Sequence, residues 1–308
     1  MKNLKNKKAK FIVSLWVTIV LISGLSFTSN IYADDLIKTA AAVTVFENAD
    51  AKIDFTDSAK TGTVKISAAA KLPETKIKVT VTKNEKNNAL YIYGLNPGTA
   101  AETYPLQMGD GGYTVRVWGK LENGRYSVIL LGIYNLVLSD KNAPFLNTSQ
   151  FVNYGKNAKA AKIAAELTIN SKTDFEKFEK IYDYVINNIE YDTYKADTVQ
   201  SGYVPSVDEI IDSGKGICFD YAAVMAAMLR SLEIPAKLVF GYVGPDNEYH
   251  AWNEVFLKSG GAFKTNGMRF EGQKFERADP TLNSMYKTGK KVLEYIGEDK
   301  NYMKTLEY

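Results

Sequence analysis

The sequence of 308 residues contains one cysteine, Cys218, and one histidine, His250. A chain with one cysteine cannot form an intramolecular disulfide. No cysteine stands directly after the apolar N-terminal segment, which excludes a lipid anchor of the bacterial cysteine type. A nucleophilic cysteine needs a base, and histidine commonly supplies it. The chain can therefore build such a site in one way only, from Cys218 and His250.

Two other patterns are missing. The sequence has no Asp-rich loop of the calcium-binding kind. Its net charge of +3 comes from the N-terminal segment, which holds five lysines and no acid; without them, the 35 acidic residues outnumber the basic ones. The remaining chain therefore has no electrostatic footprint for nucleic acid. We expect no metal ion, no cofactor and no nucleic acid partner, and the oligomeric state stays open.

Residues 1–33 have the layout of a secretory signal peptide. Lysines precede an apolar run over residues 11–25, and the small residue Ala33 stands before Asp34. The alternative is an uncleaved signal anchor, although the run is shorter than the ~20 residues of a typical spanning helix. We expect a secreted or cell-surface protein of a Gram-positive bacterium, which contacts the membrane only through this segment.

Residues 34–145 are predicted to form β-structure. Residues 76–82 alternate apolar and polar side chains with the period of a strand, and Asn123-Gly124 indicates a hairpin between two such segments. The other predicted strands are 63–66, 90–93, 113–118 and 126–131. Short strands separated by turns are typical of a sandwich. We expect an accessory immunoglobulin-like β-sandwich without a catalytic group.

Residues 146–308 show helical periodicity and are predicted to form the catalytic domain. Residues 173–188 have an apolar stripe at three- and four-residue spacing, and Thr173 and Glu176 have the spacing of a capping box. Further helices are predicted over 156–169 and 219–231, and strands over 236–243, 249–257 and 275–281. This mixture predicts an α+β domain.

Cys218 stands at the predicted start of the helix 219–231, after Gly214 and Gly216. A helix N-terminus presents unpaired N–H groups and a positive dipole end, which favour a thiolate and can bind an oxyanion. The glycines allow a close approach that a side chain would obstruct. The alternative is a small core residue, because free cysteine is among the most buried residue types.

His250 and Asp279 complete the candidate site. His250 lies near the start of a predicted strand, on the same face as Trp252 and Glu254, and Asp279 ends the next strand. An aspartate can accept a hydrogen bond from the imidazole and fix its tautomer. The alternatives are a structural histidine, and an aspartate that caps a helix or turn before Pro280.

Three sequence blocks together resemble a known family. They are GKGICFDYA at 214–222, HAWNEV at 250–255 and ADPT at 278–281. In this order and at this spacing they resemble the transglutaminase-like superfamily, and the resemblance covers roughly residues 172–283.

The resemblance implies a papain-like α+β transglutaminase core. It implies that Cys218 is the nucleophile, His250 the base and Asp279 the orienting acid. Tyr191 and Gln200 are weaker candidates for an oxyanion or positioning group. The vertebrate members depend on calcium, but this sequence gives no reason to expect calcium activation.

We therefore expect an exported cysteine acyltransferase that acts on amide bonds through a thioester. An amine acceptor gives transamidation and cross-links, and water gives hydrolysis. The expected substrates are peptides or proteins of the cell envelope, such as peptidoglycan stem peptides, an expectation that rests on location and resemblance.

This expected function has several alternatives. Two stay open, namely a cysteine peptidase or amidase without transamidation, and a non-catalytic surface-binding module. A true papain relative is disfavoured, because its histidine follows the cysteine by ~130–150 residues. Arylamine acetyltransferases share the residue order, but an exported protein would lack intracellular acetyl-CoA.

Overall fold

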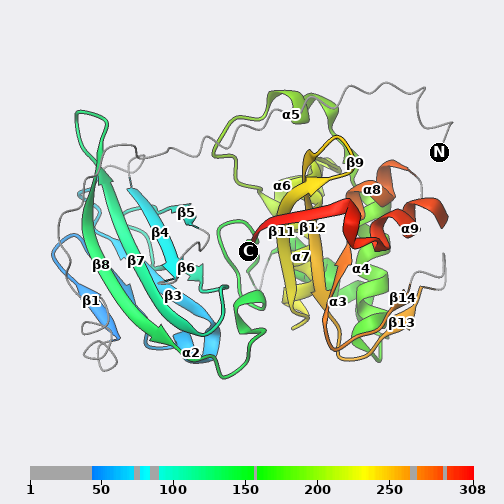
Figure 1. Ribbon diagram of the computed structural model, residues 1–308, viewed down its shortest axis with the longest axis horizontal. Helices are drawn as coiled ribbons and strands as arrows, with labels where there is room; N and C mark the ends of the chain where they lie inside the picture. Colours follow the sequence, from blue (N-terminus) through cyan, green and yellow to red (C-terminus); the bar gives the residue numbers. More distant parts are fainter. Residues whose placement is uncertain (1–43, 73–76, 84–89, 156–157, 264–268, 287–289) are drawn as a thin grey trace. The chain divides into compact units, whose positions relative to one another are not determined.

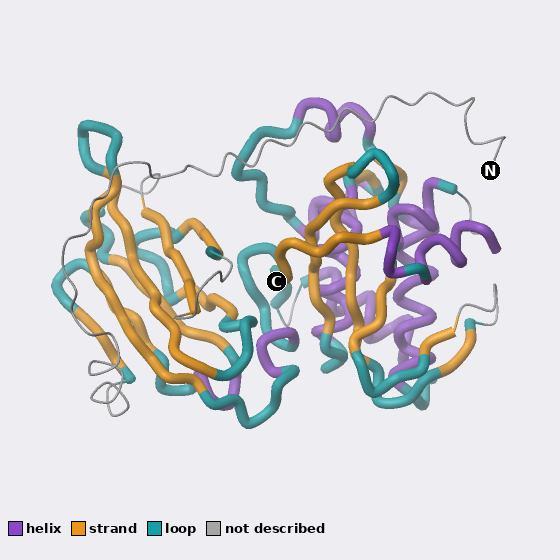
Figure 2. The backbone as a smooth tube through the Cα atoms, viewed as in Figure 1, coloured by secondary structure: helices purple, strands orange, loops and turns teal. Residues whose placement is uncertain are grey.

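The structure, a computed structural model, describes residues 44–72, 77–83, 90–155, 158–263, 269–286 and 290–308. The expected signal peptide lies outside these ranges. Among the described residues, no helix combines the length and the apolar character needed to cross a membrane. The described chain falls into two compact units, one built mainly of strands and the other of helices and strands (Figures 1 and 2).

The first unit, the β unit, contains residues 44–155 together with Glu233–Ala236 and Tyr308. One antiparallel sheet has the order β1-β2-β3-β6, with β1 (Val45–Glu47), β2 (Ala51–Asp54), β3 (Thr63–Ala68) and β6 (Glu102–Pro105). The other antiparallel sheet has the order β5-β4-β7-β8, with β5 (Tyr91–Gly94), β4 (Ile77–Lys83), β7 (Gly111–Lys120) and β8 (Tyr126–Leu136). The short helices α2 (Ser58–Thr61) and η2 (Ala143–Phe145) complete the unit.

Alternating side chains build the core of the β unit. Val79 pairs with Val117 across β4 and β7, and both side chains are fully buried, as the period-two pattern predicts. Between the sheets, the rings of Phe55 and Tyr134 stack with centroids 4.8 Å apart. Gly132 leaves room there, since a Cβ would lie 3.0 Å from the Phe55 ring. The all-β prediction is confirmed, whereas β1, β2 and β6 were not predicted because three or four residues give too short a pattern.

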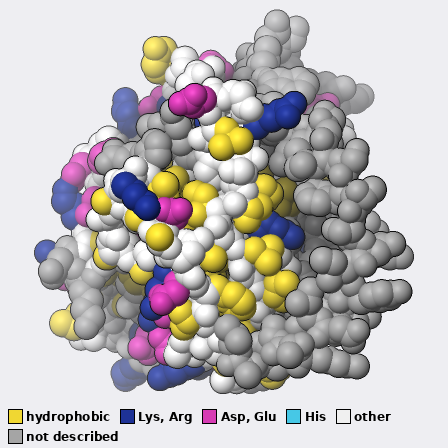
Figure 3. Space-filling model, turned by 90° about the vertical axis from the view of Figure 1, so that its left-hand side faces the viewer, with side chains coloured by type: hydrophobic (Ala, Val, Ile, Leu, Met, Phe, Trp, Pro, Cys, Tyr) yellow, Lys and Arg dark blue, Asp and Glu magenta, His cyan; other side chains and the backbone are white. Residues whose placement is uncertain are grey.

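Some apolar side chains of the β unit stay exposed. The face of this unit in Figure 3 has hydrophobic side chains gathered near its middle, with charged side chains around and between them. The register places Ile92 and Leu131 on the outward face of their sheet, separated by Thr80 and Arg116. Ile92 is 44% exposed and Leu131 40%. The outward face of this sheet therefore adds little to the buried core.

The second unit, the α+β unit, contains residues 158–232 and Lys237–Glu307. Its helices are α3 (Lys159–Thr168), α4 (Asp174–Asn188), α5 (Thr193–Thr198), α6 (Val207–Ser213), α7 (Cys218–Ser231), α8 (Pro280–Met285), α9 (Lys290–Gly297) and η3 (Asp299–Asn301). Its main sheet has the order β15-β12-β11-β16, with β15 (Phe275–Ala278), β12 (Glu248–Phe256), β11 (Ala236–Val243) and β16 (Tyr302–Glu307). Two smaller pairs are β9 (Glu190–Tyr191) with β10 (Lys215–Gly216), and β13 (Gly261–Ala262) with β14 (Arg269–Phe270). The α+β prediction is confirmed.

Helix α4 shows how local sequence sets an element's start. The Thr173 hydroxyl accepts a hydrogen bond from the N–H of Glu176 at 3.1 Å, as predicted. The Glu176 carboxylate accepts from the N–H of Lys172 at 2.6 Å, one residue before the N–H expected from a capping box. The Thr173 side chain thus caps one free N–H at the helix start, and α4 ends at Asn188 as predicted.

Helix α7 is the central helix of the α+β unit and contacts β12, α3 and α4 (Figure 1). It is buried on all sides, which suits a helix that is apolar around its whole circumference. The side chain of Asn253 on β12 donates to the carbonyl groups of Ala222 (2.9 Å) and Lys237 (3.1 Å). This amide ties α7 to β12 and β11, so the N-terminus of α7 has a fixed position against the sheet.

Candidate active site

Cys218 is the first residue of α7, and this residue is partly exposed. The Asp220 carboxylate accepts a hydrogen bond from the N–H of Ile217 at 2.9 Å and so closes the helix start. Gly216 is required here, because a Cβ would lie 2.6 Å from the Cβ of Asp220. The N–H of Cys218 belongs to the first turn, where a helix offers no acceptor. This N–H can therefore bind an oxyanion next to the sulfur.

Asp220 is fully buried and is held by two further side chains. Lys195 donates to its Oδ2 at 2.6 Å, and the Tyr203 hydroxyl donates to its Oδ1 at 2.7 Å. Burial and the Asp220 charge both raise the pKa of Tyr203, so this hydroxyl keeps its proton. The Asp220 carboxylate is therefore bound by the Lys195 cation and by two uncharged donors, the Tyr203 hydroxyl and the N–H of Ile217. It links the segment after β9 to the start of α7.

His250 lies on β12 with Cys218 on one side and Asp279 on the other. Its Nε2 is 2.9 Å from Oδ2 of Asp279, and the neighbouring Cys218 side chain acts to raise the pKa of the ring. Because Asp279 occupies Nε2, the remaining ring nitrogen, Nδ1, is the one that faces the thiol. The indole of Trp252 lies nearly parallel to the imidazole, at 19° and 6.4 Å between centroids. The ring is therefore oriented from both nitrogens and from one face.

The charge state of His250 follows from these contacts. Burial lowers its pKa, but the charge and hydrogen bond of Asp279 and the contact with Cys218 outweigh burial and raise the pKa to about 10. His250 is therefore an imidazolium at neutral pH. An imidazolium beside a cysteine sulfur stabilises the thiolate and can also release a proton to a leaving group.

Asp279 combines two roles that sequence reasoning treated as alternatives. Its Oδ1 accepts from the N–H of Leu282 at 3.0 Å, which caps α8, and its Oδ2 accepts from His250. The side chain is fully buried. Its backbone carbonyl accepts from the Tyr182 hydroxyl at 3.1 Å. The cap fixes the carboxylate, and the fixed carboxylate orients the imidazole.

The structure brings together Cys218, His250 and Asp279. It places the two weaker candidates, Tyr191 and Gln200, in different surroundings. Parallel pairing of β9 with β10 puts Tyr191 next to Gly216, and burial and the neighbouring Cys218 raise the pKa of Tyr191. The Gln200 side chain instead donates to the carbonyl of Thr198 in an exposed turn. Tyr191 thus lies near Cys218, whereas the Gln200 side chain bonds within its own turn.

Sequence reasoning missed three side chains of this site. Tyr302 donates to Oδ2 of Asp279 at 2.8 Å, and Lys195 and Tyr203 hold Asp220. Tyr302 is 23 residues beyond Asp279, on a strand that was not predicted. Only Asp220 lay in a recognised block, and its position at the third helical residue is the signal that could have suggested a cap.

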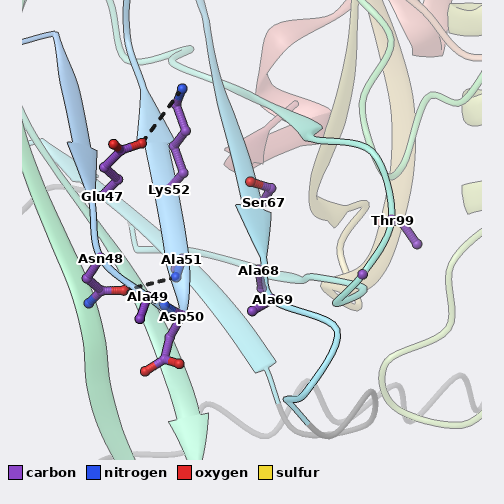
Figure 4. A pocket seen from close by; sticks show the side chains of 11 residues that line it. Glu47, Asn48, Ala49, Asp50, Ala51, Lys52, Ser67, Ala68, Ala69 and Thr99 are labelled. Carbon is purple, nitrogen blue, oxygen red and sulfur yellow. Dashed lines mark hydrogen bonds and ion pairs between the residues drawn. The ribbon is translucent and has the colours of Figure 1, made fainter.

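A shallow pocket of about 290 Å³ lies in the β unit, lined by the ends of β1, β2 and β3 and by the turns next to them (Figure 4). Figure 4 shows Lys52 directed toward Glu47, and the Asn48 side chain bonded to the backbone N–H of Ala51. The lining contains no cysteine or histidine. Within the described part of the chain, no cluster of three or more Cys, His, Asp or Glu side chains could hold a metal ion. The groups suited to covalent chemistry therefore lie in the α+β unit.

Residues 161–266 match the model of the transglutaminase-like superfamily. No curated protein sequence matches the chain.

Similar solved structures include three proteins of low sequence identity. A cysteine protease candidate from Cytophaga hutchinsonii is 15% identical, with a TM-score of 0.41 over 87% of this chain and 74% of its own. LapG of Legionella pneumophila is 14% identical, with a TM-score of 0.30 over 51% of this chain and 77% of its own. Red sea bream transglutaminase is 13% identical, with a TM-score of 0.28 over 72% of this chain and 48% of its own. The residues that match the family model include Cys218 and His250, and the match ends before Asp279.

Proposed function

We propose that this protein is an exported cysteine acyltransferase that acts on amide bonds of peptides or proteins through a thioester. The observation that carries the proposal is the position of His250 between Cys218 and Asp279, with its pKa raised to about 10. A histidine that serves only packing has no need of a fully buried carboxylate on one nitrogen and a thiol on the other.

Acylation begins when the Cys218 thiolate attacks the carbonyl carbon of a substrate amide. A C–S bond forms, and the negative charge that develops on the oxygen is stabilised by the N–H of Cys218. The His250 imidazolium then gives its Nδ1 proton to the leaving nitrogen. The C–N bond breaks, an amine departs, and the acyl group remains on sulfur as a thioester.

Deacylation reverses the proton's path. Neutral His250 takes a proton from an incoming nucleophile, which attacks the thioester and releases the Cys218 thiolate. An amine produces a new amide bond, and water produces a carboxylic acid. In both steps Asp279 keeps the imidazole in the tautomer that leaves Nδ1 free for proton transfer.

Transamidation is the first candidate for the second step, and hydrolysis is the second candidate. The partial exposure of Cys218 favours hydrolysis, because water can reach a thioester formed there. We further propose that the substrates are envelope peptides or proteins, among them peptidoglycan stem peptides. The support is the expected leader over residues 1–33, which would direct the chain to the cell surface.

The test incubates purified muropeptides and surface proteins with the wild-type protein or with Cys218→Ala, followed by mass spectrometry. New isopeptide-linked products that require Cys218 support transamidation, and Cys218-dependent fragments support hydrolysis. The matched control is Ser231→Ala, at the other end of α7. If a broad panel yields no Cys218-dependent product, the acyltransferase proposal is wrong and a binding role is favoured.

A further inference from the structure

Tyr302, the first residue of β16, reaches the site from a part of the chain beyond the family match. It pairs with Val243 on β11 at the edge of the main sheet. Its hydroxyl donates to Oδ2 of Asp279 at 2.8 Å, and the same oxygen accepts from Nε2 of His250 at 2.9 Å. One carboxylate oxygen therefore has two donors that compete for its electron density.

The Tyr302 ring is held by its neighbours. It meets the indole of Trp252 edge-on, at 70° with centroids 5.0 Å apart, and the guanidinium of Arg277 lies 4.1 Å from the ring centroid. Arg277 is itself fixed by donating to the carbonyl of Ile296 and to Asp299. The hydroxyl therefore points at Asp279 from a rigid position.

We propose that Tyr302 is a positioning residue of the active site: its hydroxyl holds Oδ2 of Asp279 in place and limits how strongly that oxygen binds the His250 imidazolium. The proposal rests on the cysteine chemistry above and adds a residue that acts through Asp279. Tyr302 does not touch the reacting atoms.

Sharing Oδ2 has a consequence for proton transfer. A hydrogen bond from Tyr302 disperses the Asp279 charge, so the imidazolium is bound less tightly and is a stronger acid toward the leaving amine. Burial and the Asp279 charge raise the pKa of Tyr302 well above its usual range, so the phenol remains a donor throughout the working pH range. Other groups also interact with this site. Cys218 on α7 and Glu248 on β12 interact with His250, Tyr182 on α4 and Tyr295 on α9 interact with Asp279, and Arg277 on β15 interacts with Tyr302.

The single histidine makes the test direct, because every imidazole resonance in the protein's NMR spectrum belongs to His250. In Tyr302→Phe, we expect the His250 pKa to rise by about 0.5 or more relative to wild type, since Oδ2 loses its competing donor. The matched control is Tyr295→Phe, whose ring centroid lies 6.5 Å from that of Tyr302 and whose pKa is raised by burial and by nearby charges that include Asp279. In this control the His250 titration should stay within about 0.2 of wild type. If Tyr302 served packing alone, Tyr302→Phe would lower the melting temperature and leave the His250 titration unchanged.

A second comparison covers the case in which Tyr302→Phe folds poorly. Asp279→Asn and the double variant Asp279→Asn/Tyr302→Phe both lack the buried charge, so the proposal requires the same His250 titration in the two proteins. A difference between them, or an unchanged or lower His250 pKa in Tyr302→Phe, overturns the role of Tyr302. Alkylation of wild-type Cys218 by iodoacetamide tests the cysteine chemistry separately. A wild-type thiol no faster than free cysteine contradicts the proposed function, whatever the result for Tyr302.

Discussion

The two units bury different kinds of side chain. In the described β unit, the buried polar residues are uncharged: Ser58, Thr63, Gln107, Thr114 and Ser149. The α+β unit buries charged residues, of which Asp220 and Asp279 are fully inaccessible to solvent. A buried charge costs several kcal/mol unless donors surround it. The difference teaches that the α+β unit keeps costly buried charges beside Cys218 and His250, whereas the buried polar residues of the β unit are uncharged.

The sharpest way to break this comparison is to remove Cys218, the proposed nucleophile. In Cys218→Ala we expect turnover of any substrate found by mass spectrometry to fall at least ~10⁴-fold, because no other thiol can form the thioester. The matched change in the β unit is Lys52→Ala, which alters the pocket of Figure 4 and should leave turnover unchanged. If Lys52→Ala also abolished turnover, the pocket of the β unit would belong to the active site.

The next largest effect is expected for Asp279→Asn. We expect kcat to fall by roughly 10³–10⁴-fold, since the amide stabilises the wrong tautomer of the imidazole and cannot stabilise an imidazolium. Without the carboxylate, burial dominates and the His250 pKa should fall below its ordinary value of 6.5. Steady-state kinetics and an NMR titration of His250 measure the two effects. A folded variant with an unchanged titration would show that Asp279 only caps α8.

The wild-type protein should keep its acid catalyst to high pH. The folded-state pKa of His250 is about 10, so the imidazolium persists at neutral pH and is lost as the pH rises through about 10. We expect the acylation rate to fall on that alkaline side, by up to about tenfold for each further pH unit. Single-turnover rates between pH 6 and 11 would show this limb. An alkaline limb near pH 6.5 instead would mean that Asp279 does not act on the imidazole in solution.

These effects also show what the sequence could and could not predict. Helices α4 and α7 and strand β11 were predicted within about one residue, because capping residues and apolar periodicity are local. The order of Cys218, His250 and Asp279 along the chain gave the three candidates that the structure brings together. The partners of Asp220 and Asp279 were missed because Lys195 and Tyr302 are distant in sequence and no local pattern marks a side chain that reaches a buried carboxylate.

Removing a cation from each unit tests the energetic side of the comparison. Lys195→Met leaves the fully buried Asp220 without its cation, and we expect a loss of about 3 kcal/mol in the free energy of unfolding of the α+β unit. Lys65 in the β unit pairs with Asp57 at 2.7 Å, but both side chains are about half exposed, so Lys65→Met should change little. Urea unfolding followed separately in the two units measures both. If both variants lost the same free energy of unfolding, Asp220 would have gained water or another donor in place of Lys195.

The smallest expected effect concerns helix caps. Thr173→Ala removes the side-chain acceptor for the N–H of Glu176, and we expect a loss of about 1 kcal/mol in the α+β unit. The matched change is Asp57→Ala, at the N-cap of α2, where no side-chain cap is formed and no helix stability should be lost. If Thr173→Ala shifted the unfolding of both units together, they would unfold as one cooperative block. The two units would then differ in the side chains that they bury, and they would not have separate free energies of unfolding.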